Sequence, residues 1–547
     1  MRRMLEANKL QITVWLATLV ILALSAVLIT QPGYMDAYYY HHVATNLASG
    51  RGLTEDYIWN YLPPPATLTH ASNLYWMPLT SLIIVPFFEI LGDSFGAAQV
   101  PFVLLASLLV LFTFRLSLWL TGNLRHALAA SALTLFSGFY FAYWTSPDSF
   151  ALFALMVNLA LLMGFRSGLG GKGVLQLKEG KRTVTSTHFK GVWFAAAAGG
   201  LAALSHLTRA DGVLVLGAVL VVIGVGAYRR GGSATEFDGR ERTLSALMLV
   251  GACIVAYLVV MSPWFFRNWQ LAGSILPTAG LRTLFLREYN DIFTYNRDLS
   301  WQSFIAWGLW PILKSKAEAL GTNTMVLFGM EYHLVPFALI GLWSFRWKER
   351  PAFLPFFVYA LTLYLTMSLL FTFPSGRGSM LHSSVALLPW LSLAAVVGLD
   401  RSIVWAAGRL RHWNVPLAQR NFTVILVFFA TVFSTFLLVQ EAGKRDERYR
   451  HYNQISAWFH ESAPDSLIMI ADPPGYYYSS GKGSIVIPSD DLDTVLLAAR
   501  RYGATYIVVE KGHSRPLQPI YAGEKTDPRL QKMVEIDMTR IFKIGDR

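Results

Sequence analysis

The sequence is divided by apolar runs that are long enough to cross a lipid bilayer. A spanning helix needs about 20 mostly apolar residues, and Leu10–Thr30 is the first such run. No small-residue cleavage site follows it, so we expect an uncleaved helix and not a signal peptide. About eleven spanning helices are predicted in all. The later ones are Phe95–Leu118, Ala127–Thr145, Ser149–Phe165, Gly191–His206, Gly212–Tyr228, Leu244–Phe265, Met325–Phe345, Ala352–Phe373, Met380–Leu399 and Phe422–Gln440.

The composition agrees with an all-α polytopic membrane protein. Of the 547 residues, 54% are hydrophobic and only 15% are charged, where soluble domains have roughly a quarter. A soluble enzyme, a disordered chain and a fibre are therefore excluded. The single cysteine, Cys253, excludes an internal disulfide framework. The net charge of +12 comes from short basic blocks between apolar runs, which is typical of membrane topology and not of nucleic-acid binding.

One shorter apolar stretch, Met77–Leu91, could cross the membrane or lie in its interface. Lys and Arg concentrate on the cytoplasmic side only if it does not cross. We therefore expect an interfacial helix there. The first outer loop (31–94), the loop 266–324 and everything after residue 440 are then extracytoplasmic, in a multi-pass protein of the plasma or inner membrane.

The last part of the chain, residues 441–547, has frequent charges and short apolar runs. It is predicted to be a small α/β domain beyond a membrane domain of residues 1–440. Ser466–Ala471 and Thr505–Glu510 are expected as buried strands, and Asp490–Tyr502 as an amphipathic helix. Asp472–Gly475 is expected to form a turn.

The segment after the first helix is the best candidate for chemistry. Asp36 lies just beyond the helix end, and Ala37–Ser49 can form an amphipathic helix. A second acid, Asp148, lies between two apolar runs on the same predicted face. Either could be a simple helix N-cap. Together they could bind a divalent cation such as Mg²⁺ or Mn²⁺, or one could act as a general base.

Basic and histidine side chains on the same face are candidate substrate contacts. Arg267 and Arg377 lie at outer helix ends, where they could bind a phosphate. Arg209 is close to Asp211, which favours a local ion pair. Three residues of the first outer loop are further candidates for substrate binding: Tyr39, His42 and His70. His41 and His382 are also expected on the outer face, although adjacent His41 and His42 do not share a helix face.

The order of these motifs resembles the GT-C superfamily of integral-membrane glycosyltransferases. The residues that carry the resemblance are the first loop around Asp36, the segment Met77–Asp93, S-P-D-S-F around Asp148, L-T-R-A-D-G around Arg209 and P-W-F-F-R-N around Arg267. The pattern is most similar to the protein O-mannosyltransferase and aminoarabinose-transferase branch. The resemblance implies transfer of a sugar from a polyprenyl-phosphate carrier to an acceptor, with inversion. It implies a catalytic Asp36, a supporting Asp148, and phosphate contacts from Arg267 and Arg377.

Other functions remain open on the sequence alone. A transporter or flippase of lipid-linked sugars should show matching halves and midplane charges, whereas the polar residues here collect at one face. An oligosaccharyltransferase-like enzyme or a polysaccharide ligase is a further alternative. The sugar, whether hexose or pentose, and the acceptor, whether protein, lipid or glycan, are not determined. No Walker A or dinucleotide motif is present, so nucleotide cofactors are not indicated.

Overall fold

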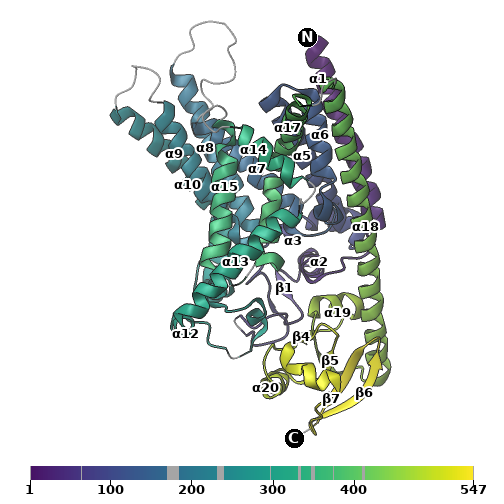
Figure 1. Ribbon diagram of the computed structural model, residues 1–547. Coiled ribbons are helices and arrows are strands. Elements are labelled where there is room, and N and C mark those ends of the chain that lie inside the picture. The colour runs from purple at the N-terminus through teal and green to yellow at the C-terminus, as the bar shows by residue number, and fades with distance from the viewer. Residues whose placement is uncertain are drawn as a thin grey trace.

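The protein is a bundle of long apolar helices with a small mixed domain at one end (Figure 1). The computed structural model describes residues 2–545, apart from 63, 169–183, 231–238, 296, 331–333, 346–350, 372, 374 and 410–412. Within these residues, nine helices are long and apolar enough to cross a membrane. They are built on α1 (Arg2–Leu28), α5 (Phe95–Thr121), α7 (Ser149–Gly168), α8 (Val184–Thr208), α9 (Val213–Arg230), α10 (Gly239–Ala272), α15 (Leu354–Leu365), α17 (Leu388–Ala407) and α18 (Val415–Ser462).

Two expected spans are divided, so nine candidates are found in the described residues where about eleven were expected. Ala127–Thr145 becomes α6 (Leu124–Leu135) and the 3-10 turn η1 (Gly138–Ala142). The break falls at Gly138, which has a positive φ of 60°. Met325–Phe345 is shared between α13 (Leu309–Met330) and α14 (Val335–Ser344).

The first outer loop lies between the bundle and the C-terminal domain (Figure 1). It contains α2 (Met35–Ala48), the two-residue strands β1 (Thr54–Glu55) and β2 (His70–Ala71), α3 (Leu79–Leu82) and α4 (Val85–Leu91). Helices α3 and α4 are both too short to cross about 30 Å of hydrocarbon. This agrees with an interfacial position for Met77–Leu91.

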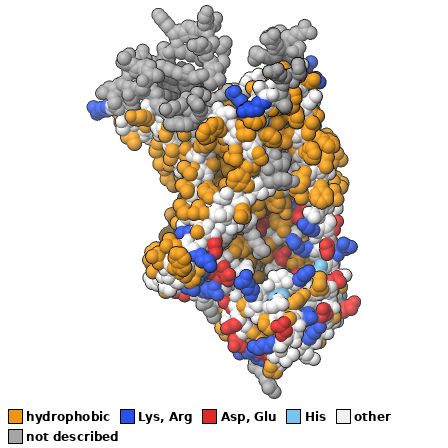
Figure 2. Space-filling view, viewed as in Figure 1, with side chains coloured by type: hydrophobic (Ala, Val, Ile, Leu, Met, Phe, Trp, Pro, Cys, Tyr) orange, Lys and Arg blue, Asp and Glu red, His pale blue; other side chains and the backbone are white. Residues whose placement is uncertain are grey.

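The surface changes in character along the bundle. Apolar side chains dominate the flanks of the helices, and charged side chains gather where the bundle meets the C-terminal domain (Figure 2). An apolar belt of this kind suits contact with lipid. We call the end of the bundle next to the C-terminal domain the domain end.

The C-terminal domain contains a five-stranded mixed sheet in the order β4-β3-β5-β7-β6. The strands are β3 (Leu467–Ile470), β4 (Ser484–Val486), β5 (Ala504–Val509), β6 (Leu530–Ile536) and β7 (Thr539–Ile544). Both expected strands and the expected helix, now α20 (Leu492–Tyr502), are confirmed. The expected turn at Asp472 is instead the start of α19 (Pro473–Ser480), because the Asp472 side chain accepts a hydrogen bond from Gly475 N at 3.1 Å.

The first outer loop is joined to the edge of this sheet. Ile58 pairs in parallel with Ile485 of the edge strand β4. Ile58 N donates to Ser484 O at 3.0 Å, and Val486 N donates to Ile58 O at 2.7 Å. The loop therefore covers a strand edge that would otherwise be unpaired, and it fixes the domain against the domain end.

Candidate functional site

Asp36 lies in the first turn of α2 at the domain end. The N-cap of this helix is Tyr34, so the alternative that Asp36 is itself the N-cap is wrong. The turn before the helix needs Gly33, whose φ is +77° and where an added Cβ would lie 2.1 Å from Arg445 Cγ. About a quarter of the Asp36 side chain, 25%, is exposed. Its carboxylate is thus free of capping and open to a ligand.

Asp148 lies directly before α7 and is 1% exposed. Its Oδ2 atom accepts a hydrogen bond from Tyr34 Oη at 2.9 Å. Its Oδ1 atom accepts from the backbone N–H of Ser149 and from Ser149 Oγ, the latter at 3.0 Å. Since Tyr34 is the N-cap of α2, this hydrogen bond ties the start of α2 to the start of α7.

His382, on the short helix α16 (Ser379–Ser383), lies next to both acids. Its Nε2 atom is 3.7 Å from Oδ2 of Asp36 and 3.7 Å from Oδ2 of Asp148. Its ring is stacked on Phe150, with the centroids 4.5 Å apart, and Nδ1 faces Gly378 O at 3.0 Å. One ligand atom from each of the three residues lies within 4.8 Å of the others. Two carboxylates and an imidazole oriented by a carbonyl form a suitable site for a divalent metal ion.

Arg209 brings a buried positive charge to the same place. Its Nε atom donates to Asp211 and to Ser383 Oγ, each at 3.0 Å, which confirms the expected ion pair with Asp211. The guanidinium also donates to Ser149 Oγ at 3.3 Å, next to Asp148. Arg209 favours the ionised form of Asp36 through its charge. The sequence indicated the ion pair but not this proximity to the two acids.

The pKa values of the two acids are shifted in opposite directions. Burial and the neighbouring Asp148 raise the pKa of Asp36 to about 7. Burial also acts to raise the pKa of Asp148, but hydrogen bonds and charge from His382, with hydrogen bonds from Ser149 and Tyr34, hold that pKa below its ordinary value. A pair of carboxyl groups with separated pKa values is a common arrangement for acid and base chemistry near neutral pH.

Comparison with known proteins identifies the fold. No family model and no curated protein sequence matches the chain. Among solved structures, ArnT from Cupriavidus metallidurans bound to undecaprenyl phosphate superposes with a TM-score of 0.60 at 12% identity, over 97% of both chains. The oligosaccharyltransferase of Archaeoglobus fulgidus superposes with a TM-score of 0.52 at 13% identity, over 93% of this chain and 70% of that one. The archaeal oligosaccharyltransferase AglB from Archaeoglobus fulgidus, in complex with an inhibitory peptide and a dolichol-phosphate, gives a TM-score of 0.52 at 11% identity, over 93% of this chain and 70% of that one.

The chain shares the fold of ArnT and of the archaeal oligosaccharyltransferase.

The two arginines expected to bind phosphate belong to other segments of this fold than Arg209. Arg267, near the end of α10, donates through Nη2 to Ser72 O at 2.8 Å and is stacked 4.7 Å from the Trp264 ring. Its buried Nη1 atom has no hydrogen-bond partner among the described residues. Arg377 ends the 3-10 turn Ser375–Arg377, just before the helix that carries His382, and its side chain lies outside the part of the chain described.

The other expected substrate contacts pair with groups of the first outer loop and not with Asp36 or Asp148. Tyr39 is 1% exposed, and its Oη accepts a hydrogen bond from Asn73 N at 2.7 Å. His42 Nε2 lies 3.2 Å from Oδ2 of Asp56. His70 Nδ1 lies 3.3 Å from Oε1 of Glu55. The first outer loop therefore contributes Asp36 to the site, while its Tyr39, His42 and His70 stabilise the loop itself.

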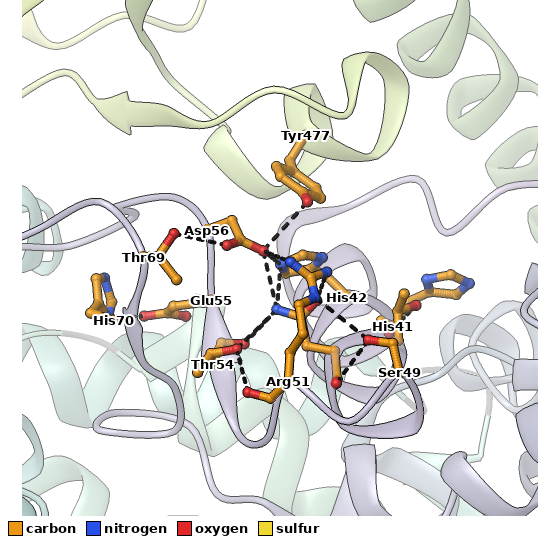
Figure 3. Close-up of polar contacts among 12 residues, drawn as sticks. His41, His42, Ser49, Arg51, Thr54, Glu55, Asp56, Thr69, His70 and Tyr477 are labelled. Carbon is orange, nitrogen blue, oxygen red and sulfur yellow. Dashed lines mark hydrogen bonds and ion pairs between the residues drawn. The ribbon is translucent and has the colours of Figure 1, made fainter.

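Asp56 is the centre of a polar network that holds α2 in place (Figure 3). Besides His42, its carboxylate accepts from Arg51 at 2.9 Å and from Asn46 at 3.2 Å. It also accepts from Thr69 Oγ1 at 3.0 Å and, across the domain boundary, from Tyr477 Oη of α19 at 3.4 Å. We call these six residues the Asp56 network. It joins the helix that carries Asp36 to the loop and to the C-terminal domain.

Proposed function

We propose that the protein is an inverting glycosyltransferase that moves a sugar from a polyprenyl-phosphate donor to an acceptor hydroxyl or amine. The observation that carries the proposal is that Asp36 and Asp148 each place a carboxylate oxygen 3.7 Å from His382 Nε2, with Arg209 beside them. ArnT bound to undecaprenyl phosphate and AglB with a dolichol-phosphate share the fold, which supports a lipid-phosphate carrier. The transferred sugar is a hexose or a pentose, and the acceptor is a protein, lipid or glycan.

In the proposed reaction, Asp36 is the general base. It takes the proton of the acceptor as the acceptor atom forms a bond to the anomeric carbon. The bond from that carbon to the phosphate oxygen breaks, and the polyprenyl phosphate leaves with the electron pair. Attack from the face opposite the leaving group inverts the anomeric configuration. A base with a pKa of about 7 is well matched to this task.

Positive charge is needed where the phosphate leaves. Arg209 supplies buried charge next to the acids, and Arg267 has one unpaired Nη1 group that can donate to a phosphate oxygen. Arg377 would be a further contact, since it is two residues from the helix that carries His382. A divalent cation held by Asp36, Asp148 and His382 would add charge stabilisation for the leaving phosphate.

The active site and the C-terminal domain are proposed to lie on the outer face of the plasma or inner membrane, where the enzyme acts on the cell envelope. The charge bias of the loops supports this orientation. Among the described side chains, those of Asp36, Asp148 and Arg209 gather at the domain end. This arrangement fits a transferase better than an alternating-access transporter of lipid-linked sugars.

The test uses the purified full chain in liposomes with a panel of radiolabelled polyprenyl-phosphate sugars and a mixture of protein, lipid and glycan acceptors. We expect one donor to release its carrier phosphate as label appears on an acceptor. Movement of the labelled lipid between leaflets, without release of carrier, would contradict the proposal and favour a flippase.

A further inference from the structure

A small polar pocket lies beside the site, where the first outer loop meets α2. Its volume is about 20 Å³, which is enough for one group of the size of a water molecule. Carboxyl, imidazole and amide groups form part of its wall, and aromatic rings form the rest. The lining includes Tyr39, Glu55, Trp59, Asn60, His70 and Tyr75.

Glu55 and His70 form a buried pair on opposite strands of the loop hairpin (Figure 3). Glu55 is 5% exposed. Its Oε1 atom is 3.3 Å from Nδ1 of His70, and that nitrogen also faces Ala71 O at 3.1 Å. Glu55 Oε2 and His70 Nε2 are both buried without a hydrogen-bond partner among the described residues. Buried polar atoms in proteins are rarely left in this state, so the pair is suited to a polar ligand group.

The chemistry of the pocket favours a neutral ligand group. Burial raises the pKa of Glu55 well above its ordinary value, so its carboxyl group is readily protonated. A cationic ligand would need Glu55 to be ionised. A buried carboxylate costs free energy unless it is fully paired and hydrogen-bonded. A hydroxyl group has the right size and can both donate and accept. The rings of Tyr39 and Trp59 offer apolar walls for the carbon atom that carries the hydroxyl.

The pocket is close to the reacting groups. Tyr39 follows Asp36 by three positions on α2, so the two side chains lie on one face of the helix, within one turn of about 5.4 Å. Tyr75 also lines the pocket, and it is near enough to Asp36 and Arg209 to feel the charge of both. A sugar ring held at Asp36 is therefore within reach of this wall.

We infer that the pocket binds one hydroxyl group of a sugar ring held at Asp36, with Glu55 as the residue that selects for it. The inference rests on the proposed function. The hydroxyl group belongs to the transferred sugar or to a glycan acceptor, and both present the same chemistry to Glu55 and His70.

The experiment compares the wild-type full chain with Glu55→Met, which keeps the length of the side chain and removes both oxygen atoms. Transfer is measured with donors that each lack one sugar hydroxyl and, separately, with acceptors that each lack one. For the wild type, we expect loss of one particular hydroxyl to lower kcat/KM by about tenfold or more. In Glu55→Met, that penalty should fall to about twofold or less, while the penalties for the other hydroxyls stay unchanged.

If the penalty that depends on Glu55 appears with a deoxy donor, the hydroxyl group belongs to the transferred sugar. If it appears with a deoxy acceptor, the hydroxyl group belongs to the glycan acceptor. If no deoxy substrate of either series shows a penalty that depends on Glu55, the inference is overturned. A wild-type chain that transfers no sugar at all would instead overturn the proposed function. Glu524→Gln, at an exposed acid of the C-terminal domain, is the control and should leave every penalty unchanged. If Glu55→Met fails to insert, His70→Phe tests the same wall of the pocket with the same readout.

Discussion

Asp36 and Asp148 are far apart in the sequence, yet each places a carboxylate oxygen 3.7 Å from one nitrogen atom, Nε2 of His382. The two acids reach this point from α2 and from the start of α7. The contact is maintained by Tyr34, which caps α2 and donates to Asp148 at 2.9 Å. The pH dependence and the metal binding predicted below follow from the contact of both acids with His382.

The first prediction concerns pH. Asp36 must be deprotonated to accept a proton, and burial and the nearby Asp148 raise its pKa to about 7. We therefore expect kcat/KM, measured without added divalent metal, to rise as the pH increases through about 7. The measurement is a profile of initial rates under subsaturating donor. A profile that is flat through this region, or one that falls, would contradict the role of Asp36 as base.

The second prediction concerns metal binding. The site of Asp36, Asp148 and His382 should bind Mn²⁺, which we would measure by calorimetry on metal-free protein. His382→Gln should weaken binding by about tenfold or more, since loss of one ligand removes a large part of the binding free energy. His460→Gln, near the end of α18 and outside the site, is the matched control and should bind as the wild type does. Equal Mn²⁺ affinity in wild type and His382→Gln would exclude this site.

The third prediction concerns Arg209. Replacement by alanine removes a buried charge and the donors to Asp211, Ser383 and Ser149. We expect kcat/KM to fall by about 10²–10³-fold, as for loss of other preorganised donors in active sites. Arg209→Lys keeps the charge but not the planar fork, so it should recover only part of the rate. Full activity in Arg209→Ala would place the phosphate elsewhere.

The fourth prediction concerns the Asp56 network. Asp56→Ala leaves the partners on α2, in the loop and on α19 without their common acceptor, and should lower the stability of the domain junction by about 1–3 kcal/mol. Hydrogen bonds, chiefly from His42, hold the pKa of Asp56 well below its ordinary value. This stabilisation is therefore present above the unfolded pKa of about 3.9 and is lost as the pH falls through the folded pKa.

The check is thermal unfolding of detergent-solubilised protein, together with the rate of proteolysis within the first outer loop. Tyr477→Phe removes only the contact that crosses from α19, and should shift the midpoint less than Asp56→Ala. If Asp56→Ala unfolds at the wild-type temperature and is cleaved no faster, the network does not hold the loop to the domain.

The sequence predicted the elements that depend on local pattern. The apolar runs, the helix after Asp36 and the buried strands near Met469 and Ile507 all follow patterns that can be counted. The expectation that this helix is amphipathic was wrong, because eight consecutive residues from Ala37 to Ala44 are buried on all its faces. Helix interruptions were harder to predict. The expected span Ala127–Thr145 is mostly apolar on both sides of Gly138, and only the positive φ of that glycine reveals the break.

The site was predicted only in part. Asp36 and Asp148 could be selected because both lie on the same predicted face of the membrane and in segments that carry the resemblance. His382 and Arg209 reach the site through tertiary packing of α16 and of the turn before α9, and no local spacing encodes that approach. Tyr39 and His42 had the right residue types, but their burial against the loop could not be seen without the fold. The resemblance at the Asp36 loop gave the fold, which the comparison with ArnT confirms.

The most direct test of the account is single-turnover sugar transfer by Asp36→Asn beside the wild type. The substitution removes the base and leaves the size of the side chain unchanged, and Asp36 makes no capping hydrogen bond, so expression and thermal stability should be unaffected. The control is Asp465→Asn, at an exposed acid of the C-terminal domain, which should transfer at the wild-type rate. We expect Asp36→Asn to be slower by about 10²–10⁴-fold. Transfer by a correctly inserted Asp36→Asn at the wild-type rate would contradict the account.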